Sequence, residues 1–142
     1  MRRTLLGVAV GLAILAVPTG TAAASSATVR LTIVHVLRGC HSWGTSDSQP
    51  LGPKRTVVLK RGARVQIRVN CSMSFDVVQL AGPRVALGGT RWQPGTAHTL
   101  AFARAGVYRL QATNIESSVD QGLQTLGPDN VLVLTVRVSQ QR

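Results

Sequence analysis

The sequence predicts an all-β fold, a Greek-key β-sandwich or barrel of about seven strands. Three observations support this prediction: apolar and polar residues alternate in short runs, glycine and proline separate the runs, and no stretch has the 3.6-residue period of an amphipathic helix. The clearest alternation directs Val65, Ile67 and Val69 toward the core. The alternation of the first strand directs Thr32 and Val34 toward solvent.

The expected strands lie at residues 29–37, 56–59, 64–70, 75–80, 96–103, 107–113 and 131–138. Segment 44–53 contains glycine, serine, aspartate and two prolines, which predicts a loop. Residues 115–126 show no clear period. Trp43 and Trp92 fall between the expected strands, so we expect them to be loop residues that cover the ends of the sandwich.

Residues 1–24 are typical of a cleavable signal peptide. Arg2 and Arg3 precede an uncharged apolar run, and small residues with an A-x-A pattern follow it. We expect cleavage after Ala24, with Ala22 or Ala27 as nearby alternatives. Cleavage after Ala24 leaves residues 25–142 as one domain of about 118 residues, enough for a single core. The arginine pair also partly matches a twin-arginine signal, so the sequence leaves the export route open.

No stretch is expected to remain in a membrane after cleavage. The apolar run of the leader ends before Pro18 and is shorter than the roughly 20 residues that cross a bilayer, and no later stretch is long enough. The mature protein is therefore expected to be secreted or to lie in a bacterial-type cell envelope or periplasm.

The chain is strongly basic, with a net charge of +11. Arg2 and Arg3 leave with the predicted signal peptide, so 14 basic and five acidic side chains remain, a net charge of +9. The basic residues are scattered and few aromatic residues accompany them, whereas single-strand nucleic-acid binders combine a basic groove with stacking rings. We therefore expect no nucleic-acid partner. The basic surface is either a solvated face with no partner, which we favour, or one that attracts anionic envelope components without specificity.

The sequence contains no recognisable catalytic set, so we do not expect an enzyme. It lacks the G-x-S-x-G and HExxH motifs and any paired-carboxylate spacing. A nucleophile needs a base that is itself held by a third group, and the sequence offers no such set. Of the histidines outside the cysteine segments, we expect His35 to be partly buried or stacked and His98 to be exposed.

The two cysteines have two interpretations. In an exported protein, an even number of cysteines suggests a disulfide, and a Cys40–Cys71 bridge would contribute roughly 3–4 kcal/mol in the chain-entropy model. Alternatively, Cys40 and His41, together with Cys71 and Met73, supply the thiolate, imidazole and thioether ligands that suit copper. Adjacent strand residues point to opposite faces, so Cys40 and His41 could share a metal only in a loop, which Gly39 allows.

Three segments, taken in order, resemble the cupredoxin family. Residues 61–70 resemble its G-D-T-V-x-F-x-N strand, residues 73–78 resemble M-P-H-N-V-V, and residues 94–108 resemble P-G-x-x-x-x-x-x-F-x-x-x-G-T-Y. The segment G-C-H-x-W at 39–43 is also similar to that of exported bacterial cupredoxin-like domains. The resemblance implies a β-sandwich with a copper site at one end.

The chain departs from the family at the copper ligands. Phe75 stands where the family has its first copper histidine, and residues 112–114 and 119–122 supply none of the later cysteine, histidine and methionine. A type-1 site needs two histidines and a cysteine, with a weak axial methionine. Met73 is the only candidate at matching positions and is not at the axial one, so we do not expect conventional blue-copper electron transfer.

The resemblance further implies that the first and third predicted strands run toward the same end, so that Cys40–His41 and Cys71–Met73 meet there. Two functions follow. The first is an exported cupredoxin-like domain that binds copper at a nonstandard site of Cys40, His41, Cys71 and Met73. The alternative is a metal-free module of the cell envelope, with a binding or structural role, that is cross-linked by a Cys40–Cys71 disulfide. Phe75 in the histidine position favours the bridge.

Overall fold

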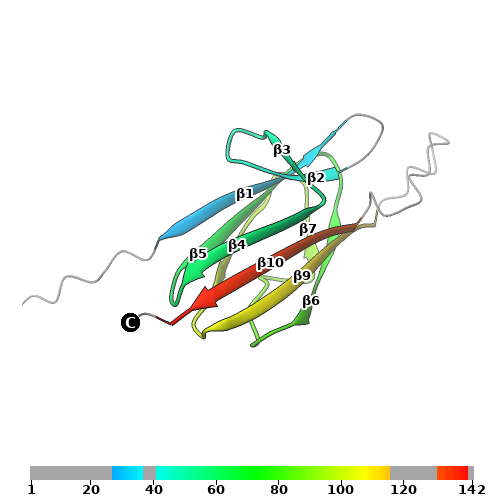
Figure 1. Ribbon diagram of the computed structural model, residues 1–142. Coiled ribbons are helices and arrows are strands. Elements are labelled where there is room, and N and C mark those ends of the chain that lie inside the picture. The colour runs from blue at the N-terminus through cyan, green and yellow to red at the C-terminus, as the bar shows by residue number, and fades with distance from the viewer. Residues whose placement is uncertain (1–26, 37–40, 116–130, 141–142) are drawn as a thin grey trace, which may run out of the picture.

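The computed structural model describes residues 27–36, 41–115 and 131–140 (Figure 1). These residues form ten strands and no helix, arranged as two five-stranded sheets that pack face to face. The predicted all-β sandwich is confirmed, with more strands than expected. The predicted signal peptide, residues 1–24, lies outside the described residues. Nowhere in the described ranges is there a helix long and apolar enough to cross a membrane.

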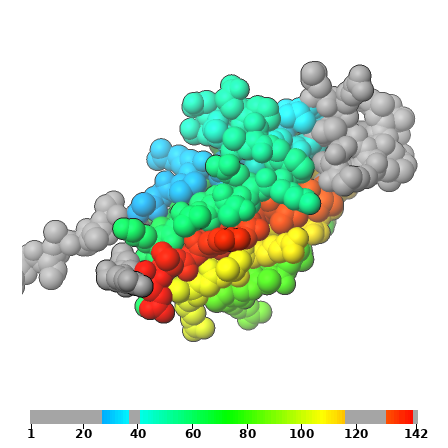
Figure 2. All heavy atoms as spheres, viewed as in Figure 1, coloured from blue at the N-terminus to red at the C-terminus, as the bar shows by residue number. Residues whose placement is uncertain are grey.

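The first sheet has the strand order β3-β2-β1-β5-β8, and the second has β4-β10-β9-β6-β7. The strands of the first sheet are β1 (Thr28–His35), β2 (His41–Gly44), β3 (Pro50–Gly52), β5 (Arg64–Asn70) and β8 (Ala97–Ala101). Those of the second are β4 (Lys54–Lys60), β6 (Phe75–Ala81), β7 (Arg91–Trp92), β9 (Gly106–Asn114) and β10 (Val131–Ser139). Figure 2 shows the outer face of the second sheet, with β10 in red between β4 and β9.

Two parallel strand pairs define the topology. β1 pairs with β5 from Thr28 opposite Arg64 to Val34 opposite Asn70, and β10 pairs in parallel with β4 in the other sheet. The first and third predicted strands, which became β1 and β5, therefore end side by side (Figure 1). The strand order and directions are those of a cupredoxin-like sandwich, as the resemblance implied.

The core lies between the sheets and contains the residues that the alternation pointed inward. Val65, Ile67 and Val69 of β5 have no exposed surface, which confirms their predicted orientation. Leu132 and Leu134 of β10 face them from the second sheet and are equally buried. Each large apolar side chain buried in this way contributes roughly 1.5–3 kcal/mol to folding.

Segment 44–53 was expected to be a loop; residues 45–49 do form a turn, but Gly44 and residues 50–52 belong to the strands of a hairpin. β2 and β3 pair as short antiparallel strands around a turn at residues 45–49. The turn folds over the outer face of β1, because the Thr32 hydroxyl donates a hydrogen bond of 2.8 Å to the Thr45 carbonyl. Thr32 and Val34, which were expected to be exposed, are buried beneath it.

The two tryptophans are core residues, so the prediction that they cover the ends of the sandwich was wrong. Trp43 and Trp92 each retain 1% of their surface exposed. The Trp43 indole N–H donates to the Val133 carbonyl at 3.0 Å, which joins β2 of one sheet to β10 of the other. Trp92 donates to the Leu87 carbonyl at 3.1 Å. An indole can be fully buried when its single donor finds such a partner.

Gly82 and Gly52 allow a test of how closely β6 approaches β9. Both glycines have a positive φ, 98° and 96° respectively. A Cβ on Gly82 would collide with the backbone of Val107 and Tyr108, whereas a Cβ on Gly52 would meet nothing within 4 Å. We expect Gly52→Ala to lose about 1–2 kcal/mol of unfolding free energy from the left-handed backbone alone. Gly82→Ala should lose about 1–3 kcal/mol more, because the collision adds to the strain.

Urea denaturation of both variants measures this difference. Equal losses would mean that the β6–β9 contact relaxes without cost and would contradict the described approach.

Candidate functional site

The parallel pairing of β1 and β5 brings three of the four sequence-predicted site residues, His41, Cys71 and Met73, to one end of the sandwich. His35 ends β1, His41 begins β2, Cys71 and Met73 follow β5, and Phe75 begins β6. His35 pairs with His41 across the β1–β2 ladder. We call these five residues the His41 end.

His41 lies between two other rings and is almost fully buried. Its exposed fraction is 3%. The His35 ring stands nearly perpendicular to it with the centroids 5.4 Å apart, and the Phe75 ring does the same from β6 at 5.2 Å. His35 itself is exposed, so the three rings run from the surface at β1 to the core at β6.

Neither ring nitrogen of His41 has a hydrogen-bond partner among the described residues. A buried polar group without a partner costs about 1–3 kcal/mol, so such a group in a native protein requires an explanation. Burial lowers the pKa of His41, and the neighbouring His35 lowers it further. Both effects favour the neutral imidazole, in which one nitrogen has a lone pair available for a metal ion.

Cys71 and Met73 are partly buried and pack against the edge of the core. The Cys71 sulfur lies 3.8 Å from the Met73 carbonyl oxygen. Ser74, between this segment and β6, donates a hydrogen bond of 2.9 Å to the side-chain carbonyl of Gln93. Because β5 ends beside β1, the Cys71–Met73 segment lies at the same end as His41, as the resemblance implied.

Cys40 lies outside the described residues, so both the disulfide with Cys71 and the four-residue metal site remain predictions. Within the described part of the chain, no three histidine, cysteine, aspartate or glutamate side chains are grouped to hold a metal ion. A site at this end would therefore depend on the thioether of Met73 and on Cys40.

Phe75 stands at the position that the resemblance assigns to a copper histidine. It is fully buried and its ring packs against His41. The buried imidazole at this end comes from β2. We expected His35 to be partly buried or stacked. The structure leaves its side chain exposed, and the β1–β2 register places its ring edge-on beside His41.

His98 has a structural role, although its side chain was expected to be exposed. It is half-buried and stacks on Trp92 with centroids 4.5 Å apart and planes 10° from parallel. The Thr96 hydroxyl donates to the Gln93 carbonyl at 2.7 Å, so it accepts at 2.9 Å from the Nε2 of His98. Burial lowers the pKa of His98.

Comparison with known proteins gives structural likeness only. No family model and no curated protein matches the chain. The structure is similar to a multicopper oxidase from Pseudomonas thermotolerans, with a TM-score of 0.49, 16% identity, and coverage of 84% of this chain and 31% of the oxidase. It is also similar to an amicyanin variant in a reduced Cu(I) form at pH 4, with a TM-score of 0.40, 18% identity, and coverage of 84% and 87%.

A third likeness is to the cysteine protease inhibitor EhICP2 from Entamoeba histolytica, with a TM-score of 0.41, 10% identity, and coverage of 81% of this chain and 98% of the inhibitor. The chain spans about a third of the length of the oxidase, 31%. We carry no ligand or activity over from these three proteins, and the architecture rests on the strand pairing of this chain.

The lowered pKa of His98 predicts a loss of stability in acid. Between the ordinary value of 6.5 and the lower folded value, the unfolded chain binds more protons than the folded chain. The contribution of His98 to stability is therefore complete above about pH 6.5 and declines as the pH falls below it. We expect the urea midpoint of the parent to fall more between pH 7.5 and pH 5.5 than that of His98→Gln. An identical fall in both would exclude His98 as the titrating group.

Proposed function

We propose that this chain is an exported cupredoxin-like module that binds Cu(I) at the His41 end and has no catalytic activity. The observation that carries the proposal is the buried His41 imidazole, neither of whose nitrogens has a partner among the described residues. The proposed ligands are His41, Cys71, Met73 and Cys40. His35, beside His41, is a further donor that the sequence interpretation did not include.

The chemistry of this set matches Cu(I). Thiolate and thioether sulfur are soft ligands that select Cu(I), and imidazole also binds copper. A bound Cu(I) would give one His41 ring nitrogen a partner, and the Cys71 thiolate would balance the positive charge. The aromatic ring of Phe75 would limit access of solvent from the core side.

The second candidate is a metal-free envelope module held by a Cys40–Cys71 disulfide. Phe75 in place of the family's histidine favours it, because the imidazole ligand of the resemblance is lost from β6. The location of Cys71 at the same end as His41, the neighbour of Cys40 in sequence, is compatible with this bridge as well. In an oxidising compartment, the disulfide competes with metal for the same two sulfurs.

Export is the part of the proposal that depends on residues 1–24. We expect material recovered from outside the cytoplasm to begin at Ser25. Intact mass spectrometry under denaturing conditions measures this start. It also reports the loss of two hydrogens that a Cys40–Cys71 disulfide would cause. A mass that retains residues 1–24 would contradict cleavage, and a disulfide in all of the material would favour the second candidate.

Copper binding is tested by competition with a chromophoric Cu(I) chelator under reducing conditions. We expect one Cu(I) per parent chain. His41→Ala should weaken binding by about tenfold or more, because it removes the one buried imidazole at the site. His98→Ala is the matched control, since it also removes a histidine but one that stacks on Trp92. If the parent retains no Cu(I), or both variants bind equally well, this function is wrong.

A further inference from the structure

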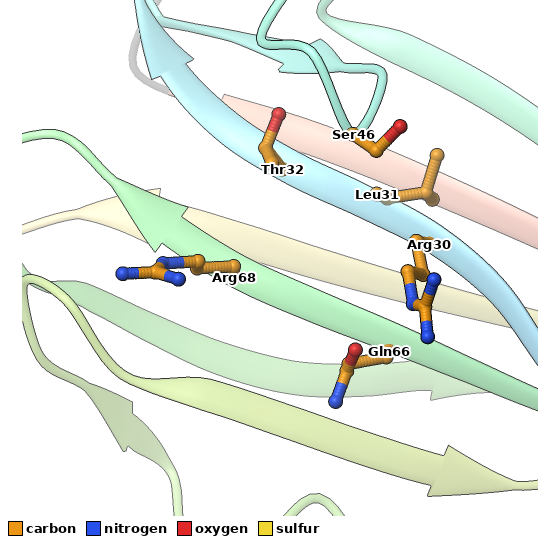
Figure 3. Close-up of a pocket in the computed structure, with 6 residues that line it drawn as sticks. All are labelled: Arg30, Leu31, Thr32, Ser46, Gln66 and Arg68. Carbon is orange, nitrogen blue, oxygen red and sulfur yellow. The ribbon is translucent and has the colours of Figure 1, made fainter.

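A cavity on the outer face of the first sheet is independent of the His41 end. Its volume is about 190 Å³, and it is lined by Arg30, Leu31, Thr32, Ser46, Gln66 and Arg68. In Figure 3, Arg30 projects from β1, Gln66 and Arg68 project from β5, and Ser46 comes from the turn after β2. We propose that this cavity binds a phosphate group.

The register of two parallel strands brings the polar groups together. Arg30 lies opposite Gln66, and Thr32 lies opposite Arg68. Successive residues of a strand point to opposite faces. On β5, Ile67 and Val69 alternate with Gln66 and Arg68 and point into the core. Arg30, Gln66 and Arg68 are therefore held on the outer face, although 38 positions separate the arginines in sequence.

The turn at residues 45–49 forms one wall of the cavity and is fixed in place. Thr32 donates to the Thr45 carbonyl at 2.8 Å, and the Asn70 side-chain amide donates to the Ser48 hydroxyl at 2.8 Å. Within the turn, the Ser48 N–H donates to the Thr45 carbonyl at 2.9 Å. A wall anchored to both β1 and β5 is formed before a ligand arrives, which lowers the entropy that binding would lose.

The charge of the cavity is positive and no acidic residue lines it. Arg30 and Arg68 are exposed and form no ion pair with a described residue. Of the two carboxylates in the described ranges, Asp76 pairs with Arg91 on the other sheet at 3.2 Å. Asp47 lies outside the lining and accepts a hydrogen bond of 3.4 Å from Ser46. Two unneutralised guanidinium groups beside one cavity attract an anion.

The size and lining identify the kind of anion. The cavity has room for about six water molecules, less than the roughly 300 Å³ of a pocket for a drug-sized ligand. The donors beside the cavity are the guanidinium groups of Arg30 and Arg68 and the Gln66 amide, because the hydroxyls of Thr32 and Ser46 already donate to the Thr45 carbonyl and to Asp47. Several donors from two strands suit the several oxygens of a phosphate better than the two of a carboxylate. No aromatic ring lines the cavity, so there is no platform for a nucleotide base.

The test is titration of the isotope-labelled mature chain with inorganic phosphate at constant ionic strength, followed by amide NMR shifts. We expect saturable shifts at residues 30–32, 45–49 and 66–68. Arg30→Gln and Arg68→Gln should each weaken phosphate binding by about tenfold or more, because a charged hydrogen bond is lost. Arg30→Lys should weaken it less, since it keeps the charge but loses the guanidinium fork.

Arg137→Gln is the matched control, because Arg137 is exposed on β10 of the other sheet and its removal changes net charge equally. We expect its phosphate affinity to stay within about twofold of the parent. Equal weakening in Arg30→Gln, Arg68→Gln and Arg137→Gln would show attraction by net charge only and would overturn the site. Shifts scattered over both sheets, or acetate binding as tightly as phosphate, would overturn it too.

One further titration, with glycerol 3-phosphate, distinguishes the source of the phosphate group. Glycerol 3-phosphate that binds more tightly than inorganic phosphate supports a phosphate monoester as the ligand. Inorganic phosphate that binds as tightly or more tightly supports the free ion. The outcome of these titrations does not depend on the proposed Cu(I) site, because neither Arg30 nor Arg68 belongs to the His41 end.

Discussion

The in-register parallel pairing of β1 with β5 is the constraint on which both candidate sites depend. These strands are neighbours in the middle of the first sheet, so one face of each lines the core and the other faces outward. Their parallel direction makes both end on the same side, which brings the His35–His41 pair and the Cys71–Met73 segment together. The same pairing places Arg30 and Arg68 on adjoining strands of the outer face.

His41 is a buried polar residue without a hydrogen-bond partner among the described residues, at the end of a core that is otherwise apolar. The inward positions of β5 and β10 hold valine, isoleucine and leucine with almost no exposed surface. At the end of this core, β2 buries a histidine whose nitrogens have no partner in the described residues. A buried polar group that lowers stability is typical of a functional site, because a protein keeps such a residue for its function and not for its contribution to folding.

The fold was predictable from the sequence where strands were long enough to show a period, and the sites were predictable only in part. Residues 64–70 alternate so clearly that both the limits and the facing of β5 were predicted correctly. β2 has four residues and no outward polar position, so no period marks it. Without β2, neither the burial of Trp43 nor the pairing of His35 with His41 could be inferred. The arginine pair was likewise hidden, because only strand register joins residues so distant in sequence.

The short strand β2 links the two proposed sites physically. It begins at His41 and leads into the turn that forms a wall of the phosphate cavity. The Trp43 N–H holds this strand to Val133 of the opposite sheet, and the Ser42 hydroxyl accepts hydrogen bonds from the N–H groups of β3. A Cβ on Gly44 would lie 2.5 Å from the Thr32 hydroxyl, so only glycine lets the turn lie flat on β1. The packing that buries the imidazole of His41 on one face therefore also fixes the position of Ser46 on the other.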